Sequence, residues 1–222
     1  MNSFDLFKAL KKSGYIKNKK EEFWWPKSGT FEVIIGAILT QQTKWGNVEK
    51  SLINLKRNNL LNEKSIAKLD VNELALLIKP SGFYNQKSKN LKKLCQNIVE
   101  NFENFENFSL HVNKDWLMDQ KGIGQESCDS ILCYACFREV MVVDNYTNRL
   151  VKKFGYEFEN YNELQEWLVD GIQSNHAKID KLYNKKMPFQ TIYARFHGKI
   201  VEFCKDNKIK KDIKIDKLKY FL

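Results

Sequence analysis

The chain has few residues that break helices, with three prolines and ten glycines among 222 residues. Strand-like alternation is nearly absent, whereas apolar residues recur every three or four positions, which places them on one face of a helix. The sequence therefore predicts an all-α fold. Helices are expected around Phe4, Phe7 and Leu10 and over residues 31–39, 46–57, 63–69, 71–78, 86–102, 114–120, 125–137, 145–154, 161–175 and 191–204.

Long hydrophobic runs are also missing. The longest, residues 33–39, is far too short to span a bilayer. The lysine-rich N-terminal segment, residues 1–20, has no apolar core of the length found in signal peptides. We therefore expect a cytoplasmic protein that does not contact a membrane.

Cysteine is scarce, and the five cysteines do not form a secreted-type disulfide framework in a chain of this length. Cys128, Cys133 and Cys136 follow the C-x4-C-x2-C spacing of one iron–sulfur class. Their segment has a helical pattern, in which cysteine is a common small core residue. We expect core cysteines and no metal site; the alternative requires a fourth ligand from Cys95 or Cys204.

Positive charge is in excess. Lysine and arginine number 37 against 27 acidic residues, which gives a formal net charge of +10. Such an excess favours polyanions, with nucleic acid first and an anionic membrane second. The lysine-rich tail, residues 205–219, is either a solvated basic end or an addition to a DNA-facing surface.

Two glycines flank one apolar residue in Gly122-Ile123-Gly124, with a helical pattern on each side. Glycine tolerates positive φ, so this unit can form a tight hairpin between helices. The N–H groups at the start of the next helix then suit a phosphate oxygen. Further on, Asp144 closes a short hydrophobic run. It either caps the following helix or acts as a lone catalytic carboxylate, and the two roles are compatible.

Several short motifs occur in order along the chain. They are FEVIIGAILTQQT at residues 31–43, SGFYNQK at 81–87, KGIG at 121–124, VVD at 142–144 and HGK at 197–199. In this order they resemble the motifs of the helix-hairpin-helix DNA glycosylase superfamily, the endonuclease III group. The resemblance implies a helical lobe of residues 30–140, a second lobe of residues 1–29 and 141–222, and a cleft between them.

The resemblance also implies roles for individual residues. Asp144 would lie beside the target sugar and stabilise the positive charge that develops as the glycosidic bond breaks. Gln41 or Gln42 would fill the space left by a flipped base; the sequence leaves this choice open. The remaining DNA contacts are expected from Gly82, Lys87, Lys121, Gly122, Ile123 and Gly124.

Three departures from the superfamily pattern indicate which kind of glycosylase to expect. Asn145 and Tyr146 follow Asp144, where the family usually has threonine and histidine. Bifunctional relatives carry a nucleophilic lysine two places after the second hairpin glycine, whereas this chain has Glu126. The C-terminal four-cysteine cluster is also missing. We therefore expect a monofunctional enzyme, without a cofactor or an iron–sulfur cluster, that leaves an abasic site.

A dense aromatic patch precedes the first motif. The patch contains Trp24, Trp25 and Pro26 and lies just before the motif at residues 31–43. Trp45 lies just after that motif. Aromatic side chains suit a flipped base, and an indole attracts a cationic alkylated purine by about 1–2 kcal/mol. The patch resembles that of the 3-methyladenine DNA glycosylase III branch. Lys199 lies in an apolar helix and, if buried, needs a partner or a chemical modification; otherwise it reaches solvent.

The resemblance thus implies a base excision repair enzyme, expected as a monomer, that hydrolyses alkylated purines, chiefly 3-methyladenine, from double-stranded DNA. Two alternatives stay open. One is a bifunctional glycosylase and lyase for oxidised pyrimidines, against which Glu126 argues. The other is a non-catalytic helix-hairpin-helix DNA-binding protein, which would leave Asp144 and the tryptophans without a purpose.

Overall fold

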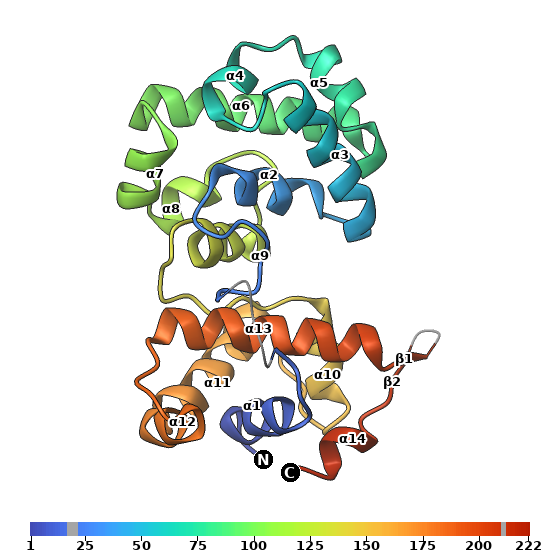
Figure 1. The fold of residues 1–222 in the computed structure, drawn as a ribbon, viewed down its shortest axis with the longest axis vertical. Helices are drawn as coiled ribbons and strands as arrows, with labels where there is room; N and C mark the ends of the chain where they lie inside the picture. Colours follow the sequence, from blue (N-terminus) through green and yellow to red (C-terminus); the bar gives the residue numbers. More distant parts are fainter. Residues whose placement is uncertain (17–21, 210–211) are drawn as a thin grey trace. The chain divides into compact units, whose positions relative to one another are not determined.

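The computed structural model describes residues 1–16, 22–209 and 212–222, and these form two compact units (Figure 1). The continuous unit is Pro26–Phe137, and the split unit joins Met1–Trp25 to Arg138–Leu222. The lobe expected from the sequence covered residues 30–140. Pro26, which was expected in the second lobe, therefore belongs to the continuous unit. Lys210 and Lys211, two lysines of the basic tail, lie outside the described residues, as do residues 17–21 of the N-terminal segment.

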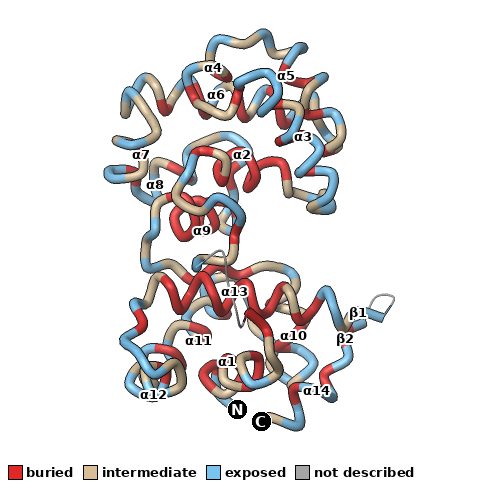
Figure 2. Tube along the Cα trace, in the orientation of Figure 1, coloured by how far each residue is buried: buried red, intermediate tan, exposed pale blue. Residues whose placement is uncertain are grey.

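The continuous unit is helical throughout its regular structure. Its elements are α2 (Phe31–Leu39), α3 (Trp45–Arg57), α4 (Glu63–Lys68), α5 (Val71–Leu77), η1 (Lys79–Ser81), α6 (Tyr84–Phe102), α7 (Phe105–His111), α8 (Lys114–Met118), α9 (Gln125–Ser130) and the π-helical η2 (Ile131–Ala135). The long α6 packs against α4, α5 and α7. Helix α2 is buried along nearly its whole length, as its red tube in Figure 2 shows.

Polar side chains define where several of these helices begin. Asn62, Asp70, Asn104 and Asn113 each accept a backbone N–H from the first turn of the helix that follows. Such a cap satisfies an N–H group that has no acceptor within the helix. Thr30 occupies the same place before α2, but its hydroxyl donates to the carbonyl of Lys27 instead.

The split unit is built around one long helix. Its elements are α1 (Ser3–Lys12), α10 (Asn145–Lys152), α11 (Tyr161–Gln173), α12 (His176–Tyr183), α13 (Phe189–Asp206), the two-residue strands β1 (Lys208–Ile209) and β2 (Asp212–Ile213), and α14 (Asp216–Lys219). Helices α1 and α10 contact α13, which is buried from Thr191 to Val201 (Figure 2). The strands pair antiparallel.

The all-α fold predicted from the sequence is confirmed, with differences in detail. Helices α7, α12 and α14 and the small β-hairpin were not predicted. The helix expected over residues 125–137 changes to a π-helical turn after Ser130. Among the described residues, none of the helices is both long and apolar enough to cross a membrane.

Candidate active site and DNA-contacting turns

Asp144 is the N-cap residue of α10. Its backbone is extended, with φ −132° and ψ 179°. Its Oδ1 accepts hydrogen bonds from the backbone N–H of Thr147 at 2.7 Å and from the Thr147 hydroxyl at 2.8 Å. The capping role that the sequence allowed is therefore present, and it uses one carboxylate oxygen.

The other oxygen of Asp144, Oδ2, lies 3.4 Å from Nε2 of His197. The two side chains are 11% and 5% exposed, so the contact is largely shielded from water. Burial raises the pKa of Asp144, but the His197 imidazole and the Thr147 hydrogen bonds outweigh burial and hold the pKa below its ordinary value. Asp144 is therefore an ionised carboxylate at neutral pH.

Trp24 contacts the same imidazole. Its ring meets that of His197 edge to face, with centroids 5.4 Å apart, and its Nε1–H donates to Oε1 of Glu202 at 3.0 Å. The backbone of Trp24 has a φ of +69°, which is uncommon for a bulky residue and is often found at functional sites. Trp25 is buried and packs against Trp24 at 6.1 Å. His197 thus contacts both the carboxylate of Asp144 and the indole of Trp24, and Trp25 packs on Trp24.

One face of α13 fixes the segment that leads to Trp24. Arg195 and Lys199 are four residues apart, and both donate to carbonyl groups of that segment. Nη2 of Arg195 reaches the carbonyl of Ile16 at 2.8 Å, and the ammonium of Lys199 reaches that of Tyr15. Lys199 is fully buried, so its side chain does not reach solvent. A hydrogen-bond partner of its ammonium is the Tyr15 carbonyl.

Gly198 permits the close approach of Trp24 to α13. A Cβ atom at this position would lie 2.4 Å from Cγ of the Trp24 side chain, a distance that real structures do not show. The absence of a side chain therefore lets the indole lie directly on the helix. Trp24 is half-buried in this place.

The split unit thus gathers an ionised carboxylate, an imidazole and two indoles. The Nζ atom of Lys205 lies 5.9 Å from the centroid of the Trp24 ring, so positive charge already lies near one of the indoles. A carboxylate that is shielded from water interacts strongly with a nearby cation. This arrangement can stabilise positive charge on a bound group or orient a water molecule.

The continuous unit contains the predicted hairpin between α8 and α9. Gly122 has a φ of +86°, and a Cβ there would lie 2.2 Å from Nδ2 of Asn90. Gly124 is the N-cap of α9, and Ile123 is buried between the two glycines, whereas Lys121 is exposed. The turn therefore needs glycine at position 122 for both its backbone conformation and its packing.

The turn after α2 separates the roles of Gln41 and Gln42. Nε2 of Gln41 donates to the carbonyl of Gly122 and to the hydroxyl of Ser127, each at 2.9 Å, so this side chain is held by the hairpin. Gln42 is exposed and has a φ of +52°. Gln42 is thus available to solvent, whereas Gln41 is bound within the unit.

Lys87 differs from its expected role as a phosphate contact. It is buried, and its ammonium donates to the carbonyls of Leu39 and Ser81, each at 2.8 Å, and to the hydroxyl of Thr43 at 2.9 Å. A lysine ammonium has three N–H donors, so none is left for a phosphate. Lys87 instead connects the end of α2 to the turn before α6.

That turn also exposes an aromatic residue that the sequence analysis did not single out. Gly82 and Phe83 have φ values of +65° and +46°, and the side chain of Phe83 is 68% exposed. The motif at residues 81–87 contained the signal, because a large apolar residue in a glycine turn is rarely there for the core. His197 and Glu202 were likewise missed as partners of Asp144 and Trp24.

The remaining predicted residues lie as follows. Trp45 is the half-buried first residue of α3 and Pro26 is exposed; both belong to the continuous unit, whereas Trp24 and Trp25 belong to the split unit. Glu126 is exposed in the first turn of α9, at the position where bifunctional relatives have lysine.

The cysteines lie in the core, as expected. Cys95, Cys128, Cys133 and Cys204 are buried, and Cys136 is partly buried. Burial raises the pKa of Cys128 to about 11 and that of Cys204 to about 12, so their thiols are protonated at neutral pH. In the part of the chain that the structure describes, no three histidine, cysteine or acidic side chains are grouped to hold a metal ion.

Comparison with known proteins decides the family. Residues 35–172 match the model of the HhH-GPD superfamily base excision DNA repair proteins, which is more than half of the chain. The chain belongs to this superfamily.

Similar HhH-GPD proteins agree with this assignment. A Methanocaldococcus jannaschii protein described as a DNA repair glycosylase is 40% identical over 189 residues, which cover 82% of this chain and 80% of that protein. The crystal structure of H. pylori 3-methyladenine DNA glycosylase bound to 1,N6-ethenoadenine has a TM-score of 0.90 and 47% identity, and the match covers 94% of this chain and 100% of that one.

A trapped endonuclease III–DNA covalent intermediate has a TM-score of 0.71 at 16% identity, with coverage of 96% of this chain and 91% of that one. At this identity the likeness concerns the fold. Together these matches identify the chain as a DNA glycosylase of base excision repair, with DNA as its partner.

Proposed function

We propose that this glycosylase is monofunctional and hydrolyses alkylated purines, chiefly 3-methyladenine, from double-stranded DNA. The observation that carries the proposal is the ionised Asp144, whose partner His197 also contacts the indole of Trp24. The similarity to a 3-methyladenine glycosylase over nearly the whole chain supports the choice of substrate.

Asp144 is the proposed catalytic residue. Loss of the base leaves positive charge on the deoxyribose, and a fixed carboxylate in a shielded site stabilises that charge in the transition state. Because the pKa of Asp144 is held below its usual value, the carboxylate does not have to lose a proton before it acts. His197 and Thr147 keep it in one orientation.

Trp24 and Trp25 are the proposed walls against which the extruded base stacks. An N-alkylated purine nucleotide carries positive charge, and an indole face attracts it by about 1–2 kcal/mol. The same charge weakens the glycosidic bond, so the reaction has little need for an acid at the base. Lys199, whose ammonium donates to the Tyr15 carbonyl, and Pro26 and Trp45 are further proposed pocket residues.

Glu126 underlies the proposal that the enzyme is monofunctional. A carboxylate cannot form a Schiff base with the sugar, whereas a lysine can. Water is then the nucleophile, and the product is an abasic site in an uncut strand. No cofactor takes part in this scheme, and the active form is proposed to be a monomer.

Gln42 is the proposed wedge, since it is exposed at a left-handed turn while Gln41 is bound to the hairpin. The hairpin from Gly122 to Gly124, with Lys121 beside it, is proposed to hold the DNA backbone. Gly82 and the exposed Phe83 form a second proposed backbone contact.

The test is excision by Asp144→Asn on duplexes that each carry one lesion, with freed bases measured by chromatography. The lesions are 3-methyladenine, 7-methylguanine, hypoxanthine, 1,N6-ethenoadenine and an oxidised pyrimidine. We expect 3-methyladenine to be released fastest and the variant to be slower by about a hundredfold or more. Asn can still cap α10, so folding should be nearly unchanged.

Asp70→Asn is the matched control, because Asp70 also caps a helix with its carboxylate, but that helix is α5 of the continuous unit. It should excise at the wild-type rate. Full activity in Asp144→Asn would refute the proposed mechanism. Release of the oxidised pyrimidine with trapping of a covalent DNA adduct by borohydride would show a bifunctional enzyme instead.

A further inference from the structure

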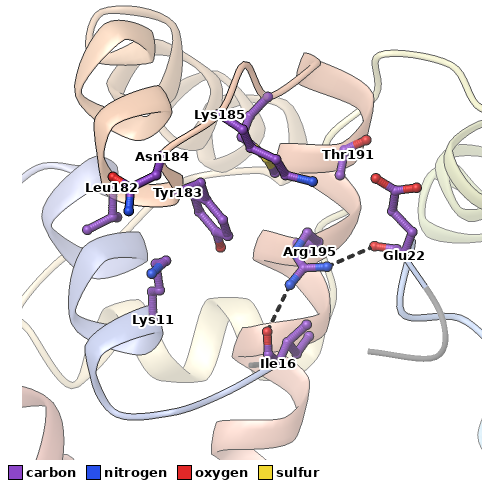
Figure 3. A pocket seen from close by; sticks show the side chains of 10 residues that line it. Lys11, Ile16, Glu22, Leu182, Tyr183, Asn184, Lys185, Thr191 and Arg195 are labelled. Carbon is purple, nitrogen blue, oxygen red and sulfur yellow. Dashed lines mark hydrogen bonds between the residues drawn. The ribbon is translucent and has the colours of Figure 1, made fainter. Parts of the chain in front are cut away.

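A concave site lies in the split unit, at a place that the proposed reaction does not use. It is a cavity of about 700 Å³ lined by residues of α1, α12 and α13 and of the segments that adjoin them (Figure 3). Its lining includes neither Asp144 nor either of Trp24 and Trp25. The volume is within the range of about 300–1,000 Å³ found for small-molecule sites.

Among the described residues that line this cavity, positive charges outnumber negative ones. Lys11 of α1, Lys185 after α12 and Arg195 of α13 contribute three positive charges, and Glu22 contributes one negative charge. Thr191, in the first turn of the 18-residue α13, also lines the cavity, so the positive end of that helix adds to the field. A concave site with this charge favours an anionic ligand.

Arg195 is the buried member of this group, at 9% exposure. Its Nη1 and Nη2 donate to the carbonyls of Glu22 and Ile16 at 3.2 and 2.8 Å, the two dashed bonds of Figure 3. A guanidinium has five N–H donors and these two bonds use two of them, so Arg195 can also donate to an anion in the cavity.

The rest of the wall is suited to a flat, apolar group. Tyr183, Leu182, Met187 and Ile16 line the cavity together with the cations. Nζ of Lys11 lies 4.7 Å from the centroid of the Tyr183 ring, so a positive charge and an aromatic surface are next to each other. A ligand that contacts both the cations and the apolar wall would need an anionic group joined to an aromatic ring.

We propose that this cavity binds a nucleoside monophosphate, with its phosphate at Lys11, Lys185 and Arg195 and its base against Tyr183 and Met187. Inorganic phosphate alone would leave most of the 700 Å³ empty. A duplex presents its backbone on a convex surface, whereas this site is concave, which favours a single nucleotide over DNA. The proposal does not depend on the substrate of the glycosylase reaction.

The experiment titrates the full-length protein with deoxyadenosine 5′-monophosphate by isothermal titration calorimetry. Deoxyadenosine, which lacks the phosphate, and inorganic phosphate, which lacks the base, are the comparison ligands. The nucleotide should bind at least about tenfold more tightly than either, because each lost part removes one set of contacts.

Lys185→Ala and Lys11→Ala should each weaken nucleotide binding by about tenfold, the effect of one charge-assisted contact. Lys185 is exposed, so its replacement should not disturb folding. Lys186→Ala and Lys12→Ala are the matched controls, since each is the sequence neighbour of a lining lysine and neither lines the cavity. Both controls should bind like the wild type.

Three results would overturn the proposal. The first is no nucleotide binding at millimolar concentration. The second is equal weakening in the lining variants and their neighbours, which would indicate a non-specific charge effect. The third is that Lys185→Ala reduces affinity for lesion-free duplex DNA while the nucleotide does not bind, which would assign these cations to the DNA backbone.

Discussion

Replacement of Lys87 by methionine tests whether a buried ammonium holds the turn that carries Gln41 and Gln42. Methionine has a similar length and no charge, so it removes the bonds to Leu39, Ser81 and Thr43 with little loss of packing. A hydrogen bond from a charged donor contributes about 1.5–3 kcal/mol. The Ser81 carbonyl keeps the Thr43 hydroxyl as a donor, and the desolvation cost of the ammonium disappears. We therefore expect a net loss of about 3 kcal/mol.

The assay is urea denaturation followed by circular dichroism, with Lys89→Met as the control. Lys89 lies on the same helix, α6, and is exposed, so its replacement should change the free energy of unfolding by less than about 0.5 kcal/mol. A loss below about 1 kcal/mol in Lys87→Met, or the same loss in both variants, would refute the reasoning.

The pH dependence gives an independent check on the same residue. Burial lowers the pKa of Lys87 to about 8, whereas an unfolded lysine titrates near about 10.4. Between these values the unfolded chain binds more protons, so wild-type stability should rise with pH, by at most about 1.4 kcal/mol per pH unit. Lys87→Met should lack this rise, and a wild-type profile equal to that of the variant from pH 8 to 10 would contradict the burial effect.

The other predictions concern the hairpin and the carboxylate. Gly122→Ala should weaken binding to lesion-free duplex, measured by fluorescence anisotropy, because of its φ of +86° and the contact with Asn90. Gly124→Ala, with open space around it, should bind normally; equal affinities for the two variants would exclude a role for this geometry. Because the pKa of Asp144 is lowered, its ionised, active form should persist to a lower pH than that of an ordinary aspartate and be lost as pH falls further. His197→Asn should move this acid limb of the excision rate to higher pH, and an unmoved limb would remove His197 from the mechanism.

Much of the fold could be predicted from periodicity, and the exceptions have physical reasons. Helix α7 has only seven residues, and Phe105 and Phe108 give a single three-residue spacing. One such spacing is too short to show a helical period. Helix α12 begins almost directly after α11, with no proline or glycine at the break, so the two are not separable by composition. The β-hairpin lies in the lysine-rich tail. Its strands have two residues each, so no alternation of apolar and polar residues can be recognised among the lysines.

The candidate site was predicted less completely, because tertiary contacts decide what its side chains do. Lysine is rarely buried, so nothing near Lys87 in the sequence indicates three oxygen acceptors from separate segments. The choice between Gln41 and Gln42 depends on a backbone φ and on a contact with Gly122, 81 positions away. Asp144 was found because its motif and its capping position are both local.

The contact between Gly198 and Trp24 ties together two positions that are far apart in the sequence. Any larger residue at 198 displaces the indole, and a smaller residue at 24 leaves a gap above the helix. The two sites are therefore expected to be epistatic, so that a change tolerated at one depends on the residue at the other. Under the proposed role of Trp24 as a wall of the base pocket, a change of lesion specificity would have to alter both positions together.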